Sequence, residues 1–350
     1  MTHSLPPARI LAIETSCDET AAAIIENGCF QLANVVASQM EVHARYGGVY
    51  PEVASRQHVL SIIPVVDQAL TQAHLALTDL DAITVTRGPG LAGSLVVGMN
   101  AAKGLAVGTG LPLIGVNHLE GHLYSAWIFD NPPNQENEKK NLPPELQFPL
   151  MALLVSGGHT ELILMENHLT YHRLGATLDD AAGEAFDKGA RLLGLGYPGG
   201  PAVQTAGEEG DAERFTFPRA WLEGRWDFSF SGVKTALLHE VRRLEEDHNP
   251  LPVADLAASF QAAIVDVLVS KTLLAAQEFS VKGILIAGGV SANRSLRDAF
   301  SRQEDFPIHI PLLSLCTDNA AMIAAAGYYR YVHNHCDTLD IDVLPTWTLA

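Results

Sequence analysis

Short runs of apolar residues alternate with longer stretches of helical periodicity along the chain, a pattern typical of an α/β protein. Ile10–Glu14 is an apolar run that predicts a strand, and after a polar turn Ala21–Ile25 predicts a returning strand. The same arrangement recurs where Met151–Val155 and Thr160–Met165 flank a tight turn. A strand hairpin therefore opens each half of the chain, which suggests an internal structural duplication.

The chain is long enough to form two domains, because a single core rarely serves 350 residues. Asp130–Pro149 holds five prolines and several Asn and Gln residues, a composition typical of a surface loop or linker. It predicts an N-terminal lobe over 1–129 and a C-terminal lobe over 150–350, and it leaves open whether the chain end packs back on the N-terminal lobe. The last helix is expected over Asn319–Val332.

Composition places the chain among ordinary globular proteins, since 47% of its residues are apolar and 18% are charged. Ser94–Gly110 is the best candidate for a membrane span, but Asn100 and Lys103 interrupt it, so no membrane contact is expected. Met1–Arg9 lacks the long apolar stretch of a secretion signal, and the four cysteines show no C-x-x-C spacing. These features predict a cytoplasmic protein with free thiols.

The formal net charge of −18 argues against non-specific binding of nucleic acid, because the mean field of the protein repels phosphate. An RNA substrate would need a local basic patch or a basic partner to supply most of the attraction.

The most specific local pattern is His118-Leu-Glu-Gly-His122. On a helix the two histidines lie four residues apart and point from the same face, close enough to bind one metal ion. Glu120 faces away, at about 200° from His118. A zinc protease of the H-E-x-x-H type needs its Glu beside the metal as general base, so that mechanism is not supported here. The alternative is that both histidines only form hydrogen bonds.

Asp318 is the candidate third ligand, in the segment Cys316–Asn319 that precedes the last expected helix. The alternative role for Asp318 is that of a helix N-cap, which Asp favours. Two His and one carboxylate would leave open positions on Fe(II) or Zn(II) for a substrate oxygen.

Several glycine-rich turns are candidates for holding a phosphate. Ser156–Thr160 offers unhindered backbone N–H groups at a hairpin tip, Gly288–Asn293 lies between a strand and a helix, and Arg87–Gly90 precedes the helix expected over Leu91–Gly108. The alternative is that the glycines of each turn only allow the chain to reverse direction and touch no ligand. No complete P-loop or dinucleotide-binding pattern is present.

Acidic residues cluster in Asp179–Lys188, which is expected to begin a helix. They are either dipole-favoured acids on a solvated face or, for Asp187, a carboxylate that accepts hydrogen bonds from a ribose diol.

Taken together, these segments resemble the TsaD family, whose members were once labelled O-sialoglycoprotein endopeptidases, and the resemblance runs from about Arg9 to Leu349. The segments that carry it are Glu14–Thr20, Tyr46–Val49, Gly88–Gly90, His118–His122, Ser156–Thr160, Asp179–Lys188, Asp227–Gly232, Gly288–Arg294 and Cys316–Asn319. The tail departs from the pattern, because Thr346 stands where relatives often carry Arg before the Trp. That difference concerns partner or tRNA contacts rather than chemistry.

The resemblance implies an α/β protein of the actin-like ATPase (ASKHA) fold, with two lobes, each a mixed sheet flanked by helices, around a nucleotide cleft. It implies transfer of a threonylcarbamoyl group from threonylcarbamoyl-AMP to the exocyclic amine of the adenosine just 3′ of the anticodon, in tRNAs that read codons beginning with adenine. The partners it implies are tRNA, an inactive TsaB-like paralogue and a small TsaE-like ATPase.

Site residues follow from the resemblance by position. It implies one divalent metal ion per subunit, with Fe(II) favoured and Zn(II) as the alternative, bound by His118, His122 and Asp318. The residues implied to bind the adenylate donor are Leu154, Val155, Ser156, Gly157, Gly158, Asp187, Gly200 and Asn293. His159 is the candidate general base.

Two other classes of protein remain as alternatives at this stage. One is a metalloprotease, as the old family label states, although the displaced Glu120 counts against it. The other is a non-catalytic scaffold like the inactive paralogue, which would have no need of His118, His122 and Asp318 together.

Overall fold

The computed structural model describes residues 7–46, 48–130, 146–222, 225–248 and 250–349. The chain divides into two compact units, one formed by Met1–Glu145 with Pro311–Leu349 and the other by Leu146–Ile310. Most of the predicted linker, residues 131–145, lies outside the described residues, as does Gly47 of the Tyr46–Val49 segment.

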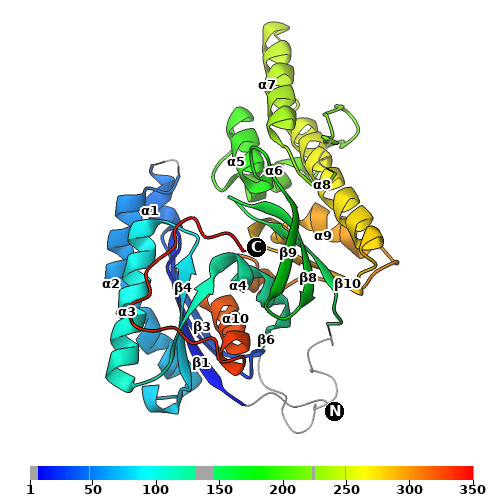
Figure 1. Ribbon diagram of the computed structural model, residues 1–350. Coiled ribbons are helices and arrows are strands. Elements are labelled where there is room, and N and C mark those ends of the chain that lie inside the picture. The colour runs from blue at the N-terminus through cyan, green and yellow to red at the C-terminus, as the bar shows by residue number, and fades with distance from the viewer. Residues whose placement is uncertain (1–6, 47, 131–145, 223–224, 249, 350) are drawn as a thin grey trace. The chain divides into compact units, whose positions relative to one another are not determined.

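The first unit contains a mixed sheet in the order β5-β4-β1-β2-β3-β6 (Figure 1). β1 and β2 form the predicted antiparallel hairpin, while β4 pairs with β1 and β5 pairs with β4 in parallel. The side chains of Leu11 and Ile13 on β1 are fully buried in the core of this unit. Its strands are β1 (Arg9–Glu14), β2 (Glu19–Glu26), β3 (Phe30–Ser38), β4 (Ala82–Gly88), β5 (Leu113–Asn117) and β6 (Phe129–Asp130).

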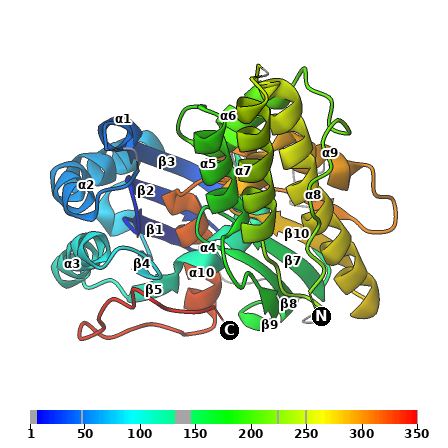
Figure 2. The same cartoon turned by 90° about the horizontal axis from the view of Figure 1, so that it is seen from above.

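Helices cover both faces of this sheet, with α2 and α3 on one side and α10 on the other (Figure 2). Gly327 lets α10 lie close to the strands, since a Cβ there would be 2.2 Å from Cγ2 of Thr84 on β4. The helices of the unit are α1 (Met40–Ala44), α2 (Pro51–Ala73), α3 (Ala92–Thr109), α4 (His118–Tyr124) and α10 (Ala320–Val332).

The packing of α10 corrects the predicted boundary of the second lobe. The range 150–350 is too long, because 311–349 belong to the first unit. The reason is physical: α10 is apolar on almost every side, and it buries that surface against β1, β2 and β5 and against α4.

The second unit contains a mixed sheet in the order β11-β10-β7-β8-β9. Its strands are β7 (Leu150–Val155), β8 (Thr160–Asn167), β9 (Thr170–Ala176), β10 (Gly283–Ala287) and β11 (Ile308–His309). β7 and β8 form an antiparallel hairpin, and β10 pairs with β7 in parallel, as β4 does with β1. Strand order and direction thus repeat those of β5-β4-β1-β2-β3, which confirms the predicted duplication.

The helices of the second unit are α5 (Ala182–Leu192), α6 (Gly199–Gly207), α7 (Ser231–Glu246), α8 (Val253–Glu278) and α9 (Arg294–Ser301). Within the described residues, α8 is long and apolar enough to cross a membrane, yet 67% of its apolar window is buried inside the structure. It packs on β7 and β10 as the core helix of this unit. The described helix with the length and apolar composition of a membrane span is therefore α8 and not Ser94–Gly110, the best candidate by sequence alone.

Candidate metal centre and glycine-rich cradle

The two histidines of the H-x-E-G-H pattern lie on α4, which begins directly where β5 ends. Asn117 is the N-cap of α4, because its side-chain oxygen accepts a hydrogen bond from the backbone N–H of Leu119 at 2.9 Å. His118 is then the first residue of the helix and His122 lies one turn later. Their ring centroids are 4.7 Å apart, which confirms that they point from the same face.

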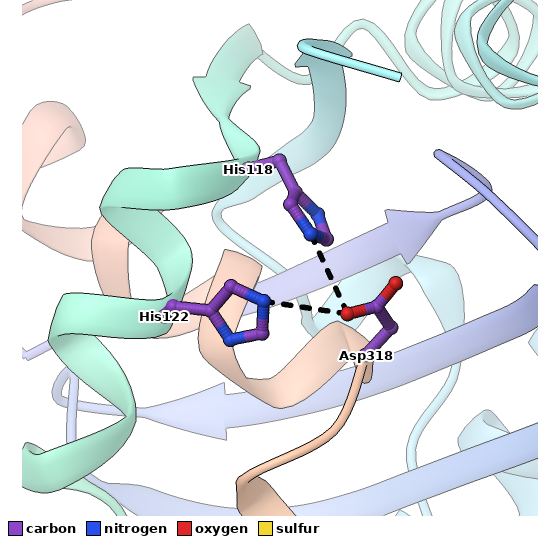
Figure 3. Close-up of side chains that lie close together, drawn as sticks. All are labelled: His118, His122 and Asp318. Carbon is purple, nitrogen blue, oxygen red and sulfur yellow. Dashed lines mark ion pairs between the residues drawn. The ribbon is translucent and has the colours of Figure 1, made fainter. Parts of the chain in front are cut away.

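Asp318 lies just before α10 and faces both imidazoles (Figure 3). Its Oδ1 is 3.4 Å from Nε2 of His118 and 3.3 Å from Nε2 of His122. The alternative of an N-cap is wrong for Asp318, because Asn319 is the N-cap and accepts a hydrogen bond from the Met322 N–H at 3.0 Å. Asp318 is left available, and the three ligand atoms lie within 4.8 Å of one another.

A second carboxylate fixes the orientation of His118. Oε2 of Glu14, at the end of β1, is 3.0 Å from Nδ1 of His118, and the Ser16 hydroxyl is 3.1 Å from the same nitrogen. The Thr86 hydroxyl donates to Glu14 at 2.6 Å and holds the carboxylate in place. With Nδ1 engaged, Nε2 of His118 is directed toward Asp318, the arrangement that orients imidazole ligands at metal sites. Among the described residues, Nδ1 of His122 has no hydrogen-bond partner.

Burial and charge act against each other within this cluster. Burial opposes the protonation of His118, but Asp318 and Glu14 outweigh it and raise the pKa of His118 well above its usual value. Burial also opposes the charge on Asp318, yet His118 and His122 outweigh it and lower the pKa of that carboxyl. For His122, burial lowers the pKa, which favours the neutral imidazole that binds metal. A partly buried carboxylate beside two imidazole nitrogens is a donor set that suits Fe(II) or Zn(II).

Glu120 is directed away from the two histidines, as the helical spacing predicts. Its carboxylate is buried and pairs with Nε of Arg330 at 2.7 Å. Since this carboxylate is engaged by α10, the metalloprotease alternative loses its general base.

In the second unit, the hairpin turn between β7 and β8 presents two exposed glycines with open space on the side where a Cβ would stand. No atom outside the immediate chain lies within 4 Å of an added Cβ at Gly157 or Gly158, and both residues are exposed. The turn is held by the N–H of Ser156, which donates to the carbonyl of His159 at 2.8 Å, and by the N–H of His159, which donates to the Ser156 hydroxyl at 3.2 Å. This turn therefore presents accessible backbone beside a half-buried His159.

Two further glycines bring neighbouring elements against this turn. Gly288 has φ +92, and a Cβ there would be 2.5 Å from the Val155 carbonyl oxygen. A Cβ at Gly183, in the first turn of α5, would be 2.6 Å from the carbonyl oxygen of Ser156. Because β7 and β10 are parallel and Leu154 pairs with Ala287, the predicted residues of these segments lie at one edge of the sheet. Ligands of open α/β sheets bind at that edge, the carboxyl end of the strands.

The other three predicted donor-binding residues lie around the same edge. Asp187 on α5 accepts a hydrogen bond from the Gly199 N–H at 2.7 Å, which places Gly200 beside it at the start of α6. Burial raises the pKa of Asp187. Asn293 is the N-cap of α9, accepts from the Leu296 N–H at 3.0 Å, and donates from Nδ2 to a side-chain oxygen of α8 at 2.7 Å.

Some features of the two sites were not predicted. Glu14 belongs to a segment shared with the family, but its contact with His118 joins residues 104 positions apart. The expected helix start at Asp179 is wrong, because α5 begins at Ala182. Asp179 instead accepts hydrogen bonds from the N–H groups of Phe230 and Ser231 at the start of α7.

The duplicated sheets place the chain in the actin-like ATPase fold class, as predicted. Among solved structures, HypF of T. kodakarensis is similar with a TM-score of 0.61 at 14% sequence identity, over 95% of this chain and 49% of that one. At that identity the likeness concerns the fold alone.

The family follows from sequence comparison. The profile of the family described as "TsaD: tRNA N6-adenosine threonylcarbamoyltransferase" matches residues 31–325. A relative of that name from Dehalococcoides mccartyi is 54% identical over 342 residues, covering 98% of this chain and 99% of the relative. Another from Thermomicrobium roseum is 54% identical over 353 residues, covering 95% of each. The chain belongs to the TsaD family, which confirms the resemblance seen in its motifs.

Proposed function

We propose that this chain transfers the threonylcarbamoyl group of threonylcarbamoyl-AMP to the exocyclic amine of the adenosine just 3′ of the tRNA anticodon, in tRNAs that read codons beginning with adenine. The observation that carries the proposal is the convergence of His118, His122 and Asp318 Oδ1 in a chain of the TsaD family. A non-catalytic scaffold would have no need of these three side chains together.

His118, His122 and Asp318 would hold one divalent metal ion, with Fe(II) favoured and Zn(II) as the alternative. The carboxylate oxygen of Asp318 and the two imidazole nitrogens suit such an ion, and the contact with Glu14 supports the orientation of His118 toward it. When bound, the ion supplies a Lewis acid for the carbamoyl oxygen of the donor.

The glycine-rich edge of the second unit would bind the adenylate part of the donor. The backbone N–H groups of Gly157 and Gly158 suit the phosphate, the carboxylate of Asp187 suits the ribose hydroxyls, and Gly200 and Asn293 complete the set. Leu154, Val155 and Ser156, at the end of β7 and the start of the turn, would contribute their backbone to the same donor site.

The chemistry needs no covalent intermediate with the protein, because an acyl-adenylate is already activated. The adenosine amine attacks the carbamoyl carbon and forms the new C–N bond. The C–O bond to the phosphate breaks, AMP leaves with the bonding electron pair, and the amine loses a proton. His159 is our candidate acceptor for that proton, because its imidazole belongs to the turn that would hold the phosphate.

The proposed reaction also needs access to the anticodon loop of tRNA and help from partner proteins. The anticodon loop presents unstacked bases that proteins can reach. Since the net charge of −18 repels RNA, we propose that a TsaB-like paralogue and a TsaE-like ATPase assist in the cytoplasm, and that partner surfaces contribute to tRNA binding.

The test is transfer of labelled threonine into tRNA from synthetic threonylcarbamoyl-AMP, with and without the two partners. We expect transfer by the wild type and its loss in His118→Ala, His122→Ala and Asp318→Ala, with metal content falling in the same three variants. His159→Ala should slow transfer and keep its metal. His172→Ala, an exposed histidine on β9, is the matched control and should behave as the wild type. A folded, metal-loaded wild type that transfers nothing with its partners would contradict the proposal.

A further inference from the structure

A buried ion pair connects the metal-site helix to the far end of α10. Nε of Arg330, in the last turn of α10, donates to Oε2 of Glu120 at 2.7 Å. The Glu120 side chain is fully buried and that of Arg330 is 20% exposed. Glu120 stands between the two histidines in the sequence, so this pair acts on the same two turns of helix that carry the candidate ligands.

α4 contacts α10 at a second point, through Gly121. A Cβ at Gly121 would lie 2.7 Å from Cδ1 of Ile323 and 3.2 Å from Cγ of Met322, so only glycine allows this approach without a shift. Asp318 precedes the start of α10, whereas Arg330 lies about 15 Å along its axis from the first helical residue, Ala320. The ion pair of Glu120 with Arg330 and the close approach at Gly121 are thus two separate points at which α4 contacts α10.

The C-terminal strap, defined here as residues 337–348, covers the Arg330 side of this arrangement. The guanidinium of Arg330 is 5.8 Å from the ring centroid of Trp347, and that of Arg87 is 5.7 Å from the same ring. Nδ2 of Asn117, the N-cap of α4, donates to the Thr348 carbonyl at 3.3 Å. Arg330 is thus held between Glu120 and an aromatic ring, and its guanidinium has little freedom to leave the pair.

We infer that Arg330 is a positioning residue for the metal centre: through Glu120 it sets the rotation of α4 at which Nε2 of both His118 and His122 faces Asp318. The inference rests on the metal site of the proposed function. Glu120 points away from the candidate metal site because of its position in the motif. In this inference its role is to orient α4, the helix that carries His118 and His122.

The test measures binding of Co²⁺ by chelator competition and by its visible absorption, which reports coordination geometry. Glu120→Met/Arg330→Met removes both charges together and leaves no unpaired buried ion. We expect it to keep the wild-type circular dichroism and to raise the Kd for Co²⁺ about tenfold or more, with a changed spectrum. Arg9→Met/Glu26→Met removes an ion pair of the same unit away from the metal and should bind Co²⁺ as the wild type does.

Each outcome decides the inference. A folded double variant with the wild-type Kd and spectrum overturns it. If the double variant does not fold, Arg330→Gln decides, because it removes the guanidinium that pairs with Glu120 and keeps a polar side chain; a rise of about threefold or more supports the inference and a wild-type Kd overturns it. If the wild type itself binds no Co²⁺, the metal assignment and this inference fall together. Binding of Co²⁺ without threonylcarbamoyl transfer would overturn the proposed function alone.

Discussion

Buried histidines serve two different purposes in the first unit. His118 lies between the carboxylates of Glu14 and Asp318, whereas the hydrogen-bond partners of His58 on α2 are neutral. Nδ1 of His58 accepts from the Thr20 hydroxyl at 2.8 Å, and its Nε2–H donates to the Cys17 carbonyl at 3.0 Å. Cys17 follows Ser16, whose hydroxyl contacts His118. The neutral imidazole of His58 therefore supports the turn that orients a candidate metal ligand.

This neutral imidazole predicts a loss of stability in acid. Burial lowers the pKa of His58, although the Cys17 carbonyl and the charges of Glu14 and Asp18 oppose the shift. Below the unfolded-state value of about 6.5, the unfolded chain therefore binds more protons than the folded one, so stability falls as pH drops from there toward the folded pKa.

The variant His58→Gln keeps a hydrogen-bonding side chain and removes the titration. We expect its Tm to fall less than that of the wild type between about pH 7.5 and about pH 5, as measured by circular dichroism. Equal losses of Tm in the two proteins would show that His58 does not contribute to the acid sensitivity.

Residue identity and spacing were sufficient to predict that His118, His122 and Asp318 lie together, but not what orients them. The four-residue spacing of His118 and His122 fixes their common face, and Asp318 stands just before a helix whose N-cap is the next residue. Glu14 and Arg330 contact the same helix across 104 and 210 positions of sequence. Spacing along the chain carries no information on contacts of that range, so both were missed.

Between elements, the close approach of α5 to the β7–β8 turn in the second unit depends on a glycine. Gly183 allows the start of α5 to lie against the β7–β8 turn, where a Cβ would meet the Ser156 carbonyl oxygen at 2.6 Å and Gly157 Cα at 2.7 Å. Both obstacles are backbone atoms, which cannot rotate away as a side chain can.

Gly183→Ala is therefore expected to displace α5 from the turn, to cost about 1–3 kcal/mol of stability and to weaken AMP binding. Gly232→Ala is the matched control, because Gly232 lies near the start of α7 with nothing within 4 Å of an added Cβ. Thermal denaturation and calorimetric titration with AMP measure both effects. Wild-type affinity for AMP in a folded Gly183→Ala protein would remove α5 from the donor site.

Elements were predicted well where their pattern is local. The strand over Gly283–Ala287 agrees with β10, and the last helix begins one residue later than expected. The start of α5 was placed too early because Asp179 has the composition of a first-turn acid. Its carboxylate in fact receives the N–H groups at the start of α7, about 50 positions later, a contact that composition cannot reveal.

At the scale of the whole molecule, the two units differ in continuity. The second unit is one stretch, Leu146–Ile310, whereas the first needs Pro311–Leu349 in addition to Met1–Glu145. The apolar surface of α10 completes the first unit by packing on β1 and β2. The linker composition predicted the first boundary approximately, but no turn or linker signal marks the return of the chain at Pro311.

This asymmetry predicts different outcomes for two truncations. A fragment of residues 146–310 should fold cooperatively, because its sheet and core are complete within that stretch. A fragment of residues 1–310 should keep the unfolding transition of the second unit. It should lose that of the first unit, because the face of the first sheet that α10 covers is exposed. Calorimetry of both fragments checks this, and an intact first unit without α10 would contradict the division.

Continuity also sets the order in which the parts of the protein can mature during translation. A ribosome makes the chain from its N-terminus, so the second unit is complete while the first still awaits α10. Until Asp318 emerges, the nascent chain holds only two of the three residues of the candidate metal centre. The cluster of His118, His122 and Asp318 therefore forms only after Asp318 has been synthesised, and products of translation interrupted before that residue lack it.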